Sequence, residues 1–347
     1  MATLNVGTVV NPRRFGLIGF DLTSSKIAQC IAAIVVVLIF TLVPAIAENY
    51  PERTTTIICP YAPGGATDIL ARMLGRKLEE HLGKSFVTDN RPGAGTVLAA
   101  HMAAKAQPDG YTLLMGTSTP LAINATLHRK LPYDPAKDFV PLALIANVPF
   151  VLVVTPSLPV KSVADLIKYA KDNPGKLSFG TSGPGSPHHL YMELFKTMTG
   201  TEMVHVPYKG SVPALTDVIA GRIPVMFVDL APALQFIKNG NVRAIGVSSI
   251  SRVPQLPEVP PVADSVPGFE AVAWQMLVAP NGTPKTIVDR LHAELKSIEA
   301  IPEFKEQVAK LGTVPVDTPS VAELQAYVKS EIVRWGKIVE KSGAAMD

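Results

Sequence analysis

The sequence contains very little cysteine, with two residues in a chain of 347. Cys30 lies in an apolar run near the N-terminus, and Cys59 lies in a short run rich in β-branched residues. If the N-terminal run is removed on export, no intrachain disulfide can form, which excludes a small disulfide-stabilised fold. We expect Cys59 to be a small, buried strand residue rather than a reactive thiol.

An excess of charge of either sign is also lacking. Charged residues make up 18% of the chain, the formal net charge is +3, and no cluster of Lys or Arg occurs that could bind nucleic-acid phosphates. No Walker-type Gly-Lys-Ser/Thr is present, and Gly-Ala-Gly-Thr-Val-Leu at residues 93–98 lacks the last glycine of a dinucleotide fingerprint. We therefore expect no nucleic-acid partner and no cofactor.

An N-terminal apolar segment indicates export. Arg13, Arg14 and Lys26 precede the apolar residues 27–43, and a sequence of small residues ends at Ala47. This pattern predicts a secretory signal peptide, residues 1–47, that is cut after Ala47. The alternative is an uncleaved membrane anchor, because the segment approaches the ~20 apolar residues that span a bilayer.

The rest of the chain alternates short apolar runs with amphipathic stretches. The predicted strands are residues 55–60, 86–90, 111–116, 149–156, 177–181, 203–206, 225–228, 243–247 and 271–280. The predicted helices are residues 68–82, 97–104, 162–173, 187–199, 213–220, 232–238, 284–300, 302–311 and 320–342. This alternation predicts an α/β fold of parallel βαβ units with helices on both faces of each sheet.

Two proline-rich connectors, residues 132–141 and 254–267, divide this pattern. The strand predicted at residues 149–156 crosses into a second lobe, and the strand predicted at residues 271–280 returns from it. We therefore predict two α/β lobes joined by two crossover segments, a clamshell with its cleft between the lobes. The predicted boundaries are residues 48–147 with 272–347 for lobe 1, and residues 148–271 for lobe 2.

The turn Pro-Gly-Gly-Ala at residues 63–66 connects the first predicted strand to the first predicted helix. Glycine lets another group approach the backbone closely. The first amides of a helix have no intrahelical acceptor, so such a turn is suited to a carboxylate or phosphate oxygen. The alternative is that the glycines only make a tight turn and that Asp68 only caps or opens the helix.

Further motifs follow in a characteristic order: Asn-Arg-Pro-Gly-Ala-Gly at residues 90–95, Gln-Pro-Asp-Gly-Tyr-Thr-Leu-Leu at 107–114, Gly-Thr-Ser-Gly-Pro-Gly-Ser-Pro-His-His-Leu at 180–190, Val-Pro-Tyr-Lys-Gly at 206–210 and Trp-Gln-Met-Leu-Val-Ala-Pro-Asn-Gly-Thr-Pro at 274–284. Together they resemble the substrate-binding proteins of tripartite tricarboxylate transporters, the Bug family, over residues 50–347. Thr96 and Cys59 depart from the family pattern, which usually has glycine and an aliphatic residue there.

The resemblance implies a type II periplasmic binding protein fold and a periplasmic location. It also implies that the turn at residues 63–67 holds one ligand carboxylate, partly through ordered water, and that the loop around Ser182 closes over it. The candidate ligand-binding residues are Pro63, Gly64, Gly65, Ala66, Thr67, Asp68, Thr117, Ser118, Ser182, Gly183, Ser186, His188, Tyr208 and Asp229. Most of these residues offer small hydrogen-bonding groups, which are suited to binding an oxyanion rather than to catalysing a reaction.

A hydrolase is the main alternative, with Ser182 as nucleophile and His188 or His189 as base. A nucleophile elbow requires Gly-x-Ser-x-Gly, and Pro184 occupies the last position. Adjacent histidines point in different directions on a helix and lack the spacing of a metal pair. We prefer packing and solvation at the helix start for both histidines, with His188 kept as a candidate cleft residue. Asp229 either contacts the distal part of the ligand or caps the following helix.

The sequence therefore predicts an exported, monomeric, non-enzymatic receptor for a small organic acid, with a membrane permease as its partner. Besides the hydrolase, two other interpretations stay open. The protein could present its ligand to a periplasmic sensor, or it could be a membrane-tethered scaffold with an empty cleft.

Overall fold

The computed structural model describes residues 50–342, and the predicted signal peptide lies outside them. From Pro51 onward the chain forms one compact unit that contains two sheets. Among residues 50–342, no helix is long and apolar enough to cross a bilayer.

The first lobe is built on a six-stranded sheet in the order β11-β4-β10-β3-β1-β2. Its strands are β1 (Thr55–Cys59), β2 (Phe86–Asn90), β3 (Thr112–Thr117), β4 (Phe139–Val148), β10 (Ala273–Pro280) and β11 (Val314–Pro315). β1 runs parallel to β2 and β3, as predicted, but β10 runs antiparallel to both β3 and β4. The parallel βαβ units predicted from the alternation are confirmed for β1, β2 and β3. The sheet as a whole is mixed, because β10 enters it from the second lobe in the opposite direction.

The second lobe contains a five-stranded sheet in the order β7-β6-β8-β5-β9. Its strands are β5 (Phe150–Val154), β6 (Ser178–Thr181), β7 (Val204–Pro207), β8 (Val225–Asp229) and β9 (Arg243–Val247). β6 is parallel to β7 and β8, so the carboxyl ends of β6 and β8 lie at the same sheet edge. β5 is antiparallel to β8 and β9, so this sheet is mixed as well.

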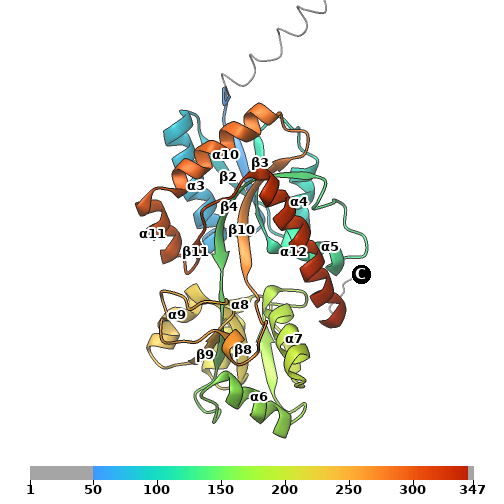
Figure 1. Ribbon diagram of the computed structural model, residues 1–347, viewed down its shortest axis with the longest axis vertical. Coiled ribbons are helices and arrows are strands. Elements are labelled where there is room, and N and C mark those ends of the chain that lie inside the picture. Colours follow the sequence, from blue (N-terminus) through green and yellow to red (C-terminus); the bar gives the residue numbers. More distant parts are fainter. Residues whose placement is uncertain (1–49, 343–347) are drawn as a thin grey trace, which may run out of the picture. The chain divides into compact units, whose positions relative to one another are not determined.

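Helices cover both sheets, and their positions agree with the periodicity of the sequence. They are α3 (Ala66–Leu82), α4 (Val97–Ala104), α5 (Asn124–Leu127), α6 (Val163–Asp172), α7 (Pro187–Thr199), α8 (Ser211–Ile219), α9 (Leu230–Lys238), α10 (Lys285–Glu299), α11 (Pro302–Lys310) and α12 (Val321–Ser342), with short turns η1 (Ala94–Thr96), η2 (Thr119–Ile123) and η3 (Val262–Asp264). Figure 1 shows α6 to α9 around the second sheet and α3, α4 and α10 around the first.

Two segments connect the lobes, as predicted: β4 continues into β5 through Pro149, and the chain after β9 returns through β10. Figure 1 shows β4 and β10 side by side between the lobes. The sequence did not predict β4, because its buried residues give no period-2 alternation and its start overlaps the proline-rich connector. The two-residue β11 is too short to leave a pattern. The exact lobe boundaries stay a prediction.

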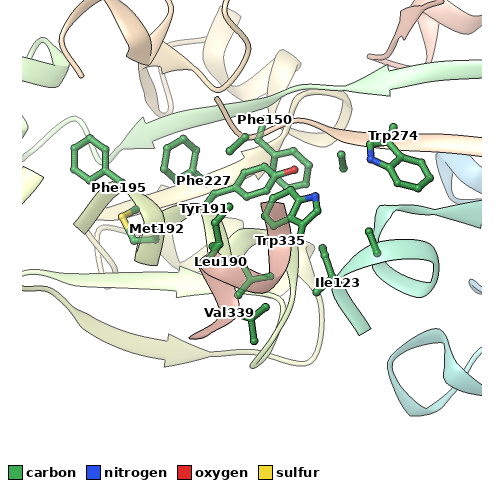
Figure 2. Packing of buried hydrophobic residues seen from close by; sticks show 14 of the residues in the cluster. Ile123, Phe150, Leu190, Tyr191, Met192, Phe195, Phe227, Trp274, Trp335 and Val339 are labelled. Carbon is green, nitrogen blue, oxygen red and sulfur yellow. The ribbon is translucent and has the colours of Figure 1, made fainter. Parts of the chain in front are cut away.

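The C-terminal helix α12 packs against both lobes. Trp335 of α12 stacks on Tyr191 of α7 with ring centroids 5.6 Å apart, and both side chains are buried (Figure 2). The buried carboxylate of Glu331 accepts hydrogen bonds from the indole N–H groups of Trp335 and Trp274, at 3.0 and 2.9 Å. The hydrophobic core therefore runs without interruption from the first lobe into the second. Trp274 therefore contributes to packing at the junction of the lobes.

Candidate ligand-binding site

A cavity of about 900 Å³ lies where the carboxyl ends of strands from both sheets meet. Its wall contains residues that follow β1, β3, β6 and β8 together with residues of β10. This volume falls in the range of small-molecule sites. Ten of the predicted residues line it: Gly64, Gly65, Ala66, Thr67, Thr117, Ser118, Ser182, Ser186, His188 and Asp229.

The turn before α3 supplies one end of the cavity. Gly64 has a φ of 88°, a conformation that favours glycine. The first helical hydrogen bond runs from the Ile69 amide to the Gly65 carbonyl at 3.0 Å. The amides of Ala66 and Thr67 therefore have no acceptor within the helix, and they lie at the positive end of the helix dipole. This is the arrangement that the sequence predicted for an oxyanion.

Asp68 braces this turn and does not line the cavity. Its carboxylate accepts hydrogen bonds from the Gly64 amide, from Arg72 Nε and from Asn90 Nδ2, all within 3.0 Å. Burial alone would raise the pKa of Asp68, but hydrogen bonds from these three partners outweigh it and hold the pKa below its usual range. The structural interpretation of Asp68 is therefore favoured over a direct ligand contact.

Buried polar atoms without partners lie in the cavity wall beside the turn. Gln275 of β10 donates from Nε2 to Thr67 Oγ1 at 2.9 Å, and its Oε1 has no hydrogen-bond partner among the described residues. Ser118 Oγ, on a residue 1% exposed, is likewise unpaired in that part of the chain. Because buried polar groups are almost always satisfied, these two atoms indicate a polar ligand or water in the cavity.

The candidate list from the sequence missed several polar residues of the wall. Tyr61 hydrogen-bonds to Thr117 Oγ1 at 2.9 Å. Asn124 Oδ1 and His128 Nε2 are buried and find no partner within the described chain. Gln275 had a usable signal, because it is the only polar residue in an otherwise apolar predicted strand. Asn124 and His128 had none, because they lie outside the recognised motifs.

The second lobe contributes a chain of three side chains. Ser182 Oγ lies 2.9 Å from His188 Nδ1, and His188 Nε2 lies 3.0 Å from Asp229 Oδ2. His188 is buried, whereas about a third of the Asp229 side chain is exposed. Loss of solvent would raise the pKa of Asp229, but the charge and hydrogen bond of His188 lower it below its usual range.

The other polar groups between β6 and α7 form hydrogen bonds with one another. The Ser186 hydroxyl donates to the Gly183 carbonyl at 2.7 Å and accepts from the His189 amide, so Ser186 is the N-cap of α7. The Gly183 amide donates to Thr181 Oγ1, and the Gly185 amide donates to His189 Nδ1, both at 3.2 Å. Gly183 does not line the cavity. The loop therefore offers the ligand side chains rather than free glycine amides.

Four other residues that the sequence singled out lie outside the cavity wall: His189, Tyr208, Pro63 and Cys59. His189 is 8% exposed and stacks on His205 at 4.0 Å, so the expected packing of the histidines at the helix start is confirmed and their expected solvation was wrong. Tyr208 donates its hydroxyl to Asp217 at 2.6 Å and stays outside the cavity wall, as does Pro63. Cys59 is fully buried, as predicted, and burial raises the pKa of its thiol.

The model of the tripartite tricarboxylate transporter family receptor matches residues 70–344 of this sequence. The chain belongs to this family. Protein BugT of Bordetella pertussis is 37% identical over 306 residues, covering 87% of this chain and 93% of BugT. The resemblance inferred from the motifs is thereby confirmed.

Solved structures of receptors in this family have the same architecture. The R. palustris protein Rpa4515 with adipate is 41% identical, covers 85% of this chain and 98% of its own, and superposes with a TM-score of 0.76. MatC from Rhodopseudomonas palustris with bound malate is 32% identical, covers 84% and 100%, and gives a TM-score of 0.73. The predicted periplasmic binding protein fold with two lobes is confirmed.

Proposed function

We propose that this receptor captures a small carboxylate-bearing solute between its lobes and delivers it to a tripartite tricarboxylate-type membrane transporter. The observation that carries the proposal is the free helix terminus at Gly65 to Thr67, which shares the cavity with the unpaired buried atoms of Ser118 and Gln275. The adipate of Rpa4515 and the malate of MatC support a carboxylate as the ligand.

The contacts at this end are sufficient for useful affinity. Hydrogen bonds to a charged group contribute roughly 1.5 to 3 kcal/mol each, and a helix N-terminus adds up to about 2 kcal/mol. Four such contacts reach the ~8 kcal/mol of micromolar binding after part is lost to ordering. Arginine is not required, and no arginine is among the described residues that line the cavity.

We also propose that the chain binds its ligand without converting it, although Ser182, His188 and Asp229 have the composition of a hydrolase triad. Acyl transfer requires donors for the developing oxyanion. The amides of Gly183 and Gly185 are occupied within the loop, and Pro184 has no N–H. Hydrolysis of 4-nitrophenyl esters that disappears in Ser182→Ala would contradict this proposal.

We further propose that the protein is exported to the periplasm, is cleaved after Ala47 and is monomeric. Its partner is a separate membrane permease. Mass spectrometry of the exported protein checks the cleavage, because the proposal expects the mature chain to begin at Glu48. Presentation of the ligand to a sensor is a second candidate role for the same binding site.

The binding proposal is tested by thermal shift on residues 48–347 with mono-, di- and tricarboxylates and their amide or ester analogues. A ligand at 100 times its dissociation constant stabilises the folded state by about 2.7 kcal/mol. We expect at least one acid to raise the melting midpoint while its neutral analogue does not. Equal shifts from acids and neutral analogues, or none from any acid, would remove the carboxylate-receptor proposal.

A further inference from the structure

The hydrogen-bonded chain Ser182–His188–Asp229 crosses three elements of the second lobe. Ser182 follows β6, His188 lies in the first turn of α7, and Asp229 ends β8. All three line the cavity, with separations of 2.9 Å from Ser182 to His188 and 3.0 Å from His188 to Asp229. Neither helix cap accounts for this chain, because Ser186 caps α7 and the Asp229 side chain makes no capping hydrogen bond at the start of α9.

The groups that face this chain from other elements are almost all uncharged. Phe150 of β5 meets the His188 ring edge to face at 5.0 Å. Tyr61 of the first lobe and Tyr191 of α7 lie near Asp229, and burial raises the pKa of each hydroxyl, which keeps both neutral. Among the described residues of the cavity wall, the permanent charges are Asp229 and Lys310.

The protonation of His188 decides what Ser182 can offer a ligand. The ionised Asp229 accepts a hydrogen bond from His188 Nε2, which keeps that nitrogen protonated. Only the protonation of Nδ1 can therefore change. A neutral ring accepts the Ser182 hydroxyl proton, and Ser182 then presents only lone pairs to the cavity. A protonated ring donates to Ser182 Oγ instead, and the hydroxyl proton is released to point at a ligand oxygen.

A ligand carboxylate at Ser182 would also lie close to Asp229, which carries the same charge. Like charges within a few ångströms disfavour each other unless a cation lies between them. Protonated His188 is such a cation, and imidazole is the side chain that changes charge in the physiological pH range. Binding of an anion at Ser182 therefore favours proton uptake by His188.

We propose that Ser182, His188 and Asp229 form a distal subsite that takes the second carboxylate of a dicarboxylate together with one proton, held by His188. This inference rests on the proposed function, in which the first carboxylate occupies the helix terminus at Gly65 to Thr67. It makes dicarboxylates the substrate class and makes their affinity decrease as pH rises.

His128 provides a matched comparison, because it is the other histidine of the described cavity wall. Its Nε2 is buried without a partner in the described chain, and no carboxylate hydrogen-bonds to its ring. Burial lowers the pKa of His128, which keeps the ring neutral. The proposal therefore assigns the proton to His188 and not to His128.

The test is isothermal titration calorimetry of residues 48–347 with adipate, malate and succinate, between pH 6 and 8. Running each titration in two buffers of different ionisation enthalpy gives the number of protons taken up. We expect proton uptake with each dicarboxylate that increases from pH 6 to pH 8, together with a loss of affinity of up to tenfold per pH unit. Hexanoate, with one carboxylate, is expected to bind with little uptake and a flatter pH profile.

The variants locate the proton. His188→Gln is expected to abolish uptake and flatten the profile, whereas His128→Gln is expected to retain both. Ser182→Ala, which keeps His188, is expected to weaken dicarboxylates by tenfold or more and hexanoate by less than threefold, and it serves if His188→Gln does not fold. Dicarboxylate binding without uptake, or uptake lost only in His128→Gln, would overturn the subsite while leaving the receptor function intact. Absence of binding by every acid would overturn both.

Discussion

Gln275 brings a hydrogen-bond acceptor into the cavity wall, with Oε1 buried and unpaired in the described chain. We expect Gln275→Leu to weaken carboxylate binding by roughly tenfold to a hundredfold, because Thr67 loses its donor and a water that bridges Gln275 Oε1 to the carboxylate loses its acceptor. The free energy of unfolding is expected to change by less than about 1 kcal/mol, since the substitution also removes an unsatisfied buried atom. Calorimetry with adipate and urea denaturation measure the two quantities.

Gln255 offers the matched control for this substitution. Its Oε1 is also buried without a partner in the described part of the chain, and its Nε2 donates to the Ala309 carbonyl at 2.9 Å. It does not line the cavity. Gln255→Leu is therefore expected to leave adipate affinity unchanged, and an equal loss in both variants would refute a specific role for Gln275.

The sequence identified individual site residues better than it identified their partners. The turn at residues 63–67 was recognisable because strand, glycines and helix are contiguous. The hydrolase alternative had already paired Ser182 with His188. The link from His188 to Asp229 depends on β6 and β8 being neighbours in one sheet, which no local pattern encodes. The sequence analysis treated His188 and His189 as partly solvated because neighbouring residues on a helix point in different directions. Tertiary packing buries both of them.

Packing between α7, β6 and β7 depends on two neutral histidines. His189 of α7 and His205 of β7 stack at 4.0 Å, and His205 stacks on Phe179 of β6 at 5.2 Å. Burial is the main cause that lowers the pKa of each ring from 6.5 to about 4, with Lys196 adding to the effect on His189 and His189 adding to the effect on His205. Protonation of either ring is therefore expected to weaken the contact.

This packing predicts a loss of stability in acid. The unfolded chain binds protons at these histidines near pH 6.5 and the folded chain only near pH 4, so protons favour unfolding in between. The contribution of these histidines to stability is complete above pH 6.5, falls as pH is lowered toward 4, and levels off below it. At about 1.4 kcal/mol per pKa unit, His189 alone contributes roughly 3 kcal/mol of this loss.

Urea denaturation between pH 7.5 and 4 measures this effect. His189→Gln is expected to reduce the fall in unfolding free energy, because the glutamine cannot become charged while its carbonyl can still accept from Gly185. His101→Gln, at the surface of the first lobe, is the control and is expected to follow the parent protein. An unchanged pH profile in His189→Gln would show that the stacked histidines do not limit acid stability.

Elements with clear periodicity were predicted well, and elements without it were not. The predicted bounds of β2, α4, α7 and β9 match the structure residue for residue. β4 was missed because a strand buried on both faces is uniformly apolar and passes into β5 across a single proline. Antiparallel insertion of β10 could not be read from the sequence, because strand direction is fixed by the long return from the second lobe.

The two lobes touch at the cavity edges through glycines. A Cβ at Gly312, after α11, would lie 2.8 Å from the Ala231 amide nitrogen at the start of α9. On another edge, a Cβ at Gly185 would lie 2.5 Å from the Leu127 side chain of α5. All four residues line the cavity. Closure of the lobes over a ligand therefore requires that these positions carry no side chain.

Gly312→Ala is accordingly expected to hold the lobes apart and to weaken binding of the acid identified by thermal shift by tenfold or more, because ligand favours the closed state only through contacts with both lobes. Gly312 also has a φ of 75°, so alanine adds backbone strain independent of the contact. Gly240→Ala separates the two effects, since Gly240 has a φ of 72° and nothing within 4 Å of its Cβ position. Small-angle scattering with the acid identified by thermal shift is expected to show compaction of Gly240→Ala but not of Gly312→Ala. If Gly312→Ala binds and compacts like Gly240→Ala, the close contact with Ala231 does not govern closure.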